Sequence, residues 1–220
     1  MPKQTFWNLP PEKRDALVAI ALEEFATHDY NAASVSRIVA RAGIAKGSLY
    51  QYFDDKEDLF LYLLDEAQRT LLGALQDDPP PDEARGFFGI LRWQMSATVR
   101  AALRYPLHAR LAQHAYMAPL PFRNQMIEQG RELRKHHMQR LLEQGIARGD
   151  INPAVNLAVA GFIVSAVIGE VGPFLLATLG LDVSRTEPVD PAQFDSALVE
   201  RLFDDIIRIL EYGLGADTAP

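Results

Sequence analysis

Cysteine is absent from the 220 residues of this chain. Its absence excludes disulfides and thiolate metal sites, and it suits a reducing compartment such as the cytoplasm. The chain also lacks internal repeats, low-complexity tracts and the strict alternation of apolar and polar residues that is typical of strands. An all-α fold is therefore expected.

An excess of basic residues is missing as well. The 22 Lys and Arg face 29 Asp and Glu, which gives a net charge of −7. This balance argues against a protein that coats nucleic acid through a broad cationic face. The first residues, MPKQTFWNLPPEK, lack the apolar core of a signal peptide, so a cytoplasmic location is expected.

Motifs of enzymes are not found. The five histidines do not form HExxH, and there is no P-loop, no GxSxG and no GxGxxG after a strand. His136 and His137 are neighbours and would point about 100° apart on a helix, so they cannot share a metal ion. We expect no enzyme activity, no cofactor and no metal. A helical protein–protein interaction module and, less favoured, an enzyme on a helical scaffold are kept as alternative functions.

The most informative segment is Ser34–Glu57, which reads SVSRIVARAGIAKGSLYQYFDDKE. Its first half has the apolar spacing of one buried helix face, with Ser34 as the N-cap and Gly43 as the residue that ends the helix. The second half buries Ile44, Leu49 and Phe53. It leaves outward Lys46, Gly47, Ser48, Tyr50 and Gln51. This layout is typical of a helix-turn-helix that enters a DNA major groove, although a structural helical hairpin has the same spacing.

The local charge favours DNA. Between Ser34 and Phe53 the chain carries Arg37, Arg41 and Lys46 and no acidic residue. A small positive strip of this kind can meet phosphates while the acidic residues lie elsewhere.

The run AGIAKGSLYQYFDDKEDLF resembles the DNA-binding signature of the TetR/AcrR family of bacterial regulators. The upstream segments ALEEFATHDY and AASVSRIVARAG are similar to the same family, so the resemblance covers roughly residues 12–60. It implies an N-terminal three-helix domain with a helix-turn-helix at 1–56. It also implies a larger helical domain at 57–220 that binds a ligand and dimerises.

The resemblance also implies which residues touch DNA. Ser34, Lys46, Tyr50 and Lys56 would meet phosphates, and Gly47 would let the backbone approach the duplex. Ser48 and Gln51 would face base edges, where a glutamine can pair with adenine. Ala45 stands where Ser or Thr is common, which removes a cap hydroxyl from the recognition helix. The full predicted set is Ser34, Arg37, Ala45, Lys46, Gly47, Ser48, Tyr50, Gln51 and Lys56.

Helices are predicted along the rest of the chain. Asp54 and Glu57 form a capping-box-like pattern at the start of a helix that runs to about Gln76, where Pro79–Pro81 break it. The predicted ranges are 11–27, 54–76, 82–104, 106–117, 121–148, 153–179 and 191–214, with a loop at 183–191 and a tail at 215–220.

The apolar stretch Leu157–Leu181 is long enough to span a membrane. We interpret it instead as a buried helix, because Glu170 and Pro173 lie inside it. Small residues recur at Gly161, Ser165 and Gly169, a spacing that permits close helix packing. Together with the final helix, the resemblance implies a homodimer interface at Gly161, Ser165, Gly169, Phe203, Ile206 and Leu210; central helices of a monomer are the alternative. A dimer suits a palindromic operator.

The middle of the chain is rich in aromatics, Met and His. The resemblance implies a small-molecule effector there, in a mostly apolar cavity, whereas for any single residue ordinary core packing is the favoured explanation. The predicted ligand contacts are Trp93, His114, Met117, Met126 and Phe162. Arg92, Arg100, Arg104 and Arg110 are an alternative set for an acidic ligand.

Overall fold

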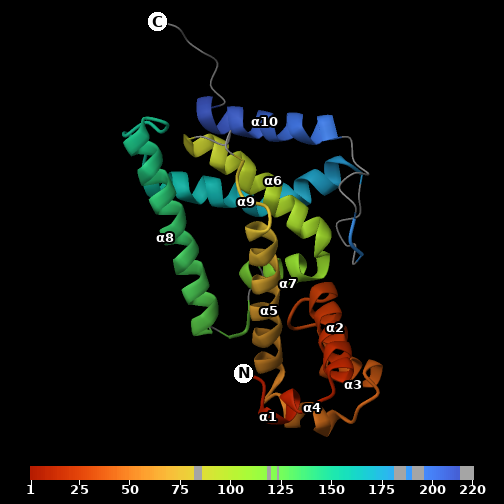
Figure 1. Ribbon diagram of the computed structural model, residues 1–220. Helices are drawn as coiled ribbons and strands as arrows, with labels where there is room; N and C mark the ends of the chain where they lie inside the picture. The colour runs from red at the N-terminus through yellow and green to blue at the C-terminus, as the bar shows by residue number, and fades with distance from the viewer. Residues whose placement is uncertain (82–85, 118–119, 123, 181–186, 190–195, 214–220) are drawn as a thin grey trace, which may run out of the picture. The chain divides into compact units, whose positions relative to one another are not determined.

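The computed structural model describes residues 1–81, 86–117, 120–122, 124–180, 187–189 and 196–213. Within these ranges the secondary structure is helical throughout and contains no strand, which confirms the all-α prediction (Figure 1). The predicted loop at 183–191 and the predicted tail lie almost wholly outside the described residues.

The helices begin and end close to the predicted positions. They are α1 (Gln4–Trp7), α2 (Pro11–Thr27), α3 (Val35–Arg41), α4 (Lys46–Tyr52), α5 (Lys56–Gln76), α6 (Gly86–Arg104), α7 (Pro106–Met117), α8 (Gln125–Arg148), α9 (Leu157–Thr178) and α10 (Ser196–Tyr212). The short helix α1 was not predicted. Both α2 and α7 begin with a proline, which suits the first turn because it needs no N–H donor there.

The described residues form two compact units. Unit 1 contains α1–α4, α5 as far as Ala74, and α7, and α2 packs against α7. Its core includes Phe25 of α2 and Phe60 of α5, whose ring centroids lie 5.4 Å apart. Both rings are almost fully buried. The predicted N-terminal domain, which ended at residue 56, is smaller than this unit. Most of α5 and all of α7 also belong with the N-terminal helices.

Unit 2 contains α6, α8, α9 and α10. In this unit α9 packs against both α6 and α8, and α10 packs against α6 (Figure 1). Buried side chains from all four helices meet in one core, including Met95, Leu142, Leu175 and Phe203.

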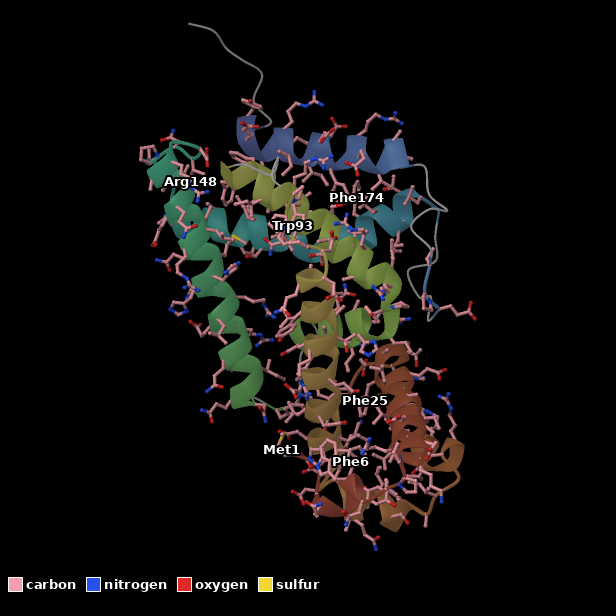
Figure 2. All side chains as sticks on the ribbon, viewed as in Figure 1. Met1, Phe6, Phe25, Trp93, Arg148 and Phe174 are labelled. Atoms are coloured by element: carbon pink, nitrogen blue, oxygen red, sulfur yellow. The ribbon has the colours of Figure 1, made fainter. Side chains whose placement is uncertain are left out.

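Helix α9 is not the buried helix that was predicted. Val164, Val171 and Leu175 are buried on one face, but Phe162 is 73% exposed and Val159 is 53% exposed. Phe174 also reaches the surface (Figure 2). By length and composition α9 is the one helix among the described residues that is apolar enough to cross a membrane. The protomer therefore leaves a large apolar face of α9 uncovered.

Candidate DNA-binding interface

The turn between α3 and α4 has the geometry that the sequence predicted. Ser34 caps α3, with its hydroxyl accepting from the backbone N–H of Arg37 at 3.4 Å. Gly43 has φ of +65°, its N–H donates to Ala40, and Ile44 N–H donates to Val39. These two bonds form a Schellman motif, which ends α3 and turns the chain sharply into α4.

Helix α4 has one buried side and one open side. Leu49, together with Phe53 just after the helix, is 1% exposed and anchors it to unit 1. The outward residues are exposed except for Ser48, which is half-buried: Ala45, Lys46, Gly47, Tyr50 and Gln51. The N-cap, Ala45, makes no side-chain cap bond, as the sequence predicted. This open side is the surface that can enter a groove.

Gly47 has no steric reason to be glycine within the chain. Its φ is not positive, and a Cβ built on it would meet no atom within 4 Å. Glycine weakens a helix relative to alanine. The fold therefore does not require a residue without a side chain at this position on the open side. The absence of a side chain would let the backbone of α4 approach a partner closely.

Two of the three basic residues of the predicted strip are already paired with carboxylates of α2. Arg37 donates from Nε to Glu24 at 2.9 Å, and its Nη2 donates both to Glu24 and to the carbonyl of Ala32. Arg41 donates to Glu23 at 2.5 Å. Within the described part of the chain Lys46 makes no ion pair. The cationic strip is therefore narrower than its sequence suggests.

Glu24 is the buried centre of this arrangement, with an exposed fraction of 2%. It also accepts from the backbone N–H of Ser34 at 2.7 Å. Burial alone would raise the pKa of Glu24, but the hydrogen bonds from Arg37 and Ser34 outweigh it and hold that pKa below its ordinary value. Sequence reasoning missed this residue, because nothing local marks one glutamate of LEEF as buried.

Lys56 is the first residue of α5, which was predicted to begin at residue 54, and its ammonium lies 4.5 Å from the ring centroid of Tyr30. Burial lowers the pKa of Lys56, and burial with nearby Glu57 and Asp55 raises the pKa of Tyr30 to about 12. The capping pattern is shifted by one residue from the prediction. Asp58 N–H donates to Asp55 Oδ1 at 2.8 Å, so Asp55 takes the N-cap position predicted for Asp54.

Comparison with known proteins agrees with this geometry. The family model for bacterial regulatory proteins of the tetR family matches residues 17–63, which hold most of α2, all of α3 and α4, and the start of α5. The crystal structure of a TetR family transcriptional regulator from Chloroflexus aurantiacus J-10-FL is 33% identical, with a TM-score of 0.82. The match spans 97% of this chain and 98% of that one. The chain belongs to the TetR family.

This TetR family member is accordingly a ligand-responsive, DNA-binding transcriptional regulator. A curated relative, the fatty acid metabolism regulator protein of Bacillus subtilis, is 22% identical over 70% of this chain and 78% of its own length. The structure of FadR from Bacillus subtilis in complex with stearoyl-CoA is 19% identical over 91% of this chain and 99% of that one. Its TM-score of 0.63 shows a shared fold.

The residues predicted for the ligand site of this regulator belong to both units. His114 belongs to unit 1, where its Nδ1 lies 3.0 Å from the carbonyl oxygen of Phe25. Trp93 belongs to unit 2, where its Nε1 donates to the carbonyl of Asp78 at 3.1 Å (Figure 2). Phe162 is exposed and lines no cavity that the structure describes. The side chains of Met117 and Met126 lie outside the described residues.

A different set of residues lines a cavity of about 130 Å³ within unit 2. Its wall is mostly apolar and comes from α6, α9 and α10, with Leu103, Leu175 and Phe203 among the residues. Its polar members are Ser96, Arg100 and Glu200. Arg100 belongs to the alternative set of arginines that the sequence offered for an acidic ligand.

The residues predicted for the dimer interface differ in how exposed they are. Ser165 and Gly169 are exposed on α9, but a Cβ on Gly161 would meet Leu142 and Met138 of α8 at 3.6–3.7 Å. Phe203 is 1% exposed in the core of its own protomer, so its prediction as an interface residue is corrected. Ile206 and Leu210 are partly buried against the same core.

Proposed function

We propose that this regulator is a cytoplasmic homodimeric repressor that binds a palindromic operator and releases it when an amphipathic, anionic small molecule binds unit 2. The observation that carries the proposal is the open side of α4, with exposed Lys46, Gly47, Tyr50 and Gln51 on a helix anchored by buried Leu49. One such helix reads few base pairs, and two related by a two-fold axis read a palindrome with half-sites about 34–36 Å apart or a multiple of that.

The uncovered face of α9 supports the homodimer. Exposed apolar side chains lie at Val159, Phe162, Ile163 and Phe174, with the small residues Ser165 and Gly169 between them. A contiguous apolar surface is costly in water, and a second copy of the same helix offers a matching surface. Glu170 is exposed on the same helix. Placing it in lipid would carry the cost of an intramembrane carboxylate, so a protein partner is favoured over a bilayer.

The cavity of unit 2 supports the ligand class. Apolar walls suit a hydrocarbon chain. Arg100 at the wall donates to the carboxylate of Asp78 at 2.9 Å, and an anionic head group would take the place of that carboxylate. The relatives point the same way, since one is named for fatty acid metabolism and another was solved with stearoyl-CoA. At about 130 Å³ the cavity accepts only a short segment of such a chain.

A longer ligand must therefore widen the cavity. A ligand that binds the wider conformation more tightly shifts the population toward it, and if that conformation fits the operator poorly the complex dissociates. By linkage, operator DNA weakens ligand binding by the same factor.

The first test is selection of bound duplexes from a randomised DNA pool with purified protein at physiological salt. The proposal expects a two-fold symmetric site. Lys46→Ala should weaken all duplexes alike and reduce the salt slope by about one, whereas Gln51→Ala should blunt preference at one base pair per half-site. Lys13→Ala, on the exposed side of α2, is the control for losing one positive charge. Enrichment of asymmetric sites, or none, would contradict the operator proposal.

The ligand is tested with the selected operator. Stearoyl-CoA is titrated into the complex while fluorescence anisotropy reports release, and coenzyme A without the acyl chain is the control. Release by stearoyl-CoA alone supports the proposed class. Release by both compounds, or by neither, rejects an acyl-chain ligand and leaves the DNA-binding proposal standing.

A further inference from the structure

The three carbonyl groups at the end of the recognition helix are satisfied by the segment that precedes α2. A helix leaves its last C=O groups without intrahelical partners. Two of these carbonyl groups in α4 accept from Lys3. Its backbone N–H donates to Tyr52 O at 2.8 Å, and its Nζ donates to Tyr50 O at 2.9 Å. The hydroxyl of Thr5 donates to Gln51 O. Two residues of one short segment therefore complete the whole last turn of α4.

This segment is anchored by aromatic packing. Phe6 is fully buried, and its ring centroid lies 5.1 Å from that of Phe53 and 5.4 Å from that of Tyr62 (Figure 2). Phe53 follows the recognition helix directly, and Tyr62 lies on α5. Trp7 extends the cluster, with the guanidinium of Arg14 lying 5.6 Å from its ring. The segment Lys3–Trp7 is therefore packed against the residue that follows α4 and against α5.

Lys3 has a second partner at the same place. Its ammonium lies 2.8 Å from Oδ1 of Asp54, whose side chain is 72% exposed. The hydrogen bond from Lys3 and its positive charge lower the pKa of Asp54. Asp54 comes two residues after α4, so without Lys3 a bare carboxylate would stand beside the surface that must approach phosphates. A cation at this end of the helix also opposes the negative end of its dipole.

We propose that Lys3–Trp7 is an N-terminal clip that positions the recognition helix and neutralises Asp54, so that the clip sets operator affinity without reading bases. Lys3 and Thr5 are its positioning residues. Their donors fix the backbone of Tyr50 and Gln51, the residues that the proposed interface presents to phosphate and base.

The test measures operator affinity as a function of salt for single and paired variants. Thr5→Val removes the donor to Gln51 O while keeping the shape of the side chain. It should weaken operator binding about three- to tenfold, the value of one lost hydrogen bond. Thr5→Ser keeps the hydroxyl and should bind like the parent protein. Both proteins must remain folded and dimeric by circular dichroism and sedimentation.

Lys3 is tested against Asp54. Lys3→Met should weaken binding about tenfold, and Lys3→Met with Asp54→Asn should recover most of that loss, because the unpaired carboxylate is gone. Lys3→Arg keeps the charge and a donor, and should stay within about twofold of the parent protein. Lys13→Met controls for the loss of one surface charge, since Lys13 lies exposed on α2.

Two results would overturn the proposal. Equal loss from Lys3→Met with and without Asp54→Asn, with a salt slope reduced by about one, would make Lys3 a direct phosphate contact instead of a positioning residue. Unchanged affinity in both Thr5→Val and Lys3→Met would show that the clip has no part in DNA binding. If Lys3→Met does not fold, the comparison of Thr5→Val with Thr5→Ser decides by itself whether the clip affects operator affinity.

Discussion

Glu24 of α2 accepts a hydrogen bond at 2.7 Å from the backbone N–H of Ser34, the residue that caps α3. The same carboxylate holds Arg37, one turn into α3. A single buried acid therefore fixes where the first helix of the motif begins and how it lies on α2. The orientation of α4 follows from it, because only the short turn at Gly43 separates the two helices.

Glu24→Gln should destabilise the protein by about 1–3 kcal/mol at pH 7, because charge-assisted bonds to Arg37 and Ser34 are replaced by weaker ones. The native pKa of Glu24 is lowered, so its stabilising effect is present above the unfolded pKa of about 4.3 and is lost as pH falls through the native value. Thermal unfolding at pH 7, 4 and 3 should show the gap between the two proteins closing. Glu23→Gln, at a partly exposed pair, is the control, and a constant gap would contradict the assignment.

Gly43→Ala should cost about 1–2 kcal/mol, which is the price of the left-handed conformation for a residue with a Cβ. A Cβ at Gly43 would meet no atom within 4 Å, so the backbone conformation alone accounts for the loss. Gly43→Asn should lose less, because Asn tolerates this conformation better. Urea unfolding measures both variants. Equal losses for Ala and Asn would point to packing instead.

Gly47→Ala should leave stability unchanged or raise it by up to about 1 kcal/mol, because alanine favours the helix and the added methyl meets open space. Operator affinity should nevertheless fall at least tenfold, since the methyl would stand between the α4 backbone and the DNA. Anisotropy titration and urea unfolding on the same preparation separate the two effects. Undiminished operator binding would show that the backbone at Gly47 does not approach the duplex.

Phe162→Glu should convert the proposed dimer into monomers, because it places a carboxylate on the apolar face of α9. The matched control is Leu133→Glu, on α8, where the side chain is 70% exposed, close to the 73% of Phe162. Sedimentation analysis of both variants is the measurement. A dimer that survives Phe162→Glu, or one that Leu133→Glu disrupts equally, would place the interface elsewhere.

Glu66→Gln should stabilise the protein at pH 7. Burial raises the pKa of Glu66 despite the nearby Arg69, and its Oε2 has no hydrogen-bond partner among the described residues. A raised native pKa means that the folded state holds its proton longer, so stability falls as pH rises from about 4.3 through the native value. The variant should have a higher Tm than the parent protein at pH 7 and a similar Tm at pH 4. An equal difference in Tm between the variant and the parent protein at pH 7 and pH 4 would mean that the charge of Glu66 does not cause the stabilisation.

The sequence determined the local features, because each depends on a few consecutive residues. The spacing of Leu49 and Phe53 predicted the buried side of the recognition helix, and Gly43 predicted the turn. The glycine at Gly47 and the missing cap at Ala45 could likewise be read directly. Signals of this kind, such as caps, turns and a period of 3.6 residues, need no knowledge of what packs against them.

Only the tertiary structure decided which distant residues meet. It paired Arg37 with Glu24 and Lys3 with the end of α4, and it buried Phe203 while exposing Phe162. Helical periodicity says that a face is apolar, but not whether its own protomer or another covers it, since both remove the same surface from water. For that reason the sequence alone located the DNA-binding motif, while the clip, the buried acid and the open face of α9 emerged only from the packed helices.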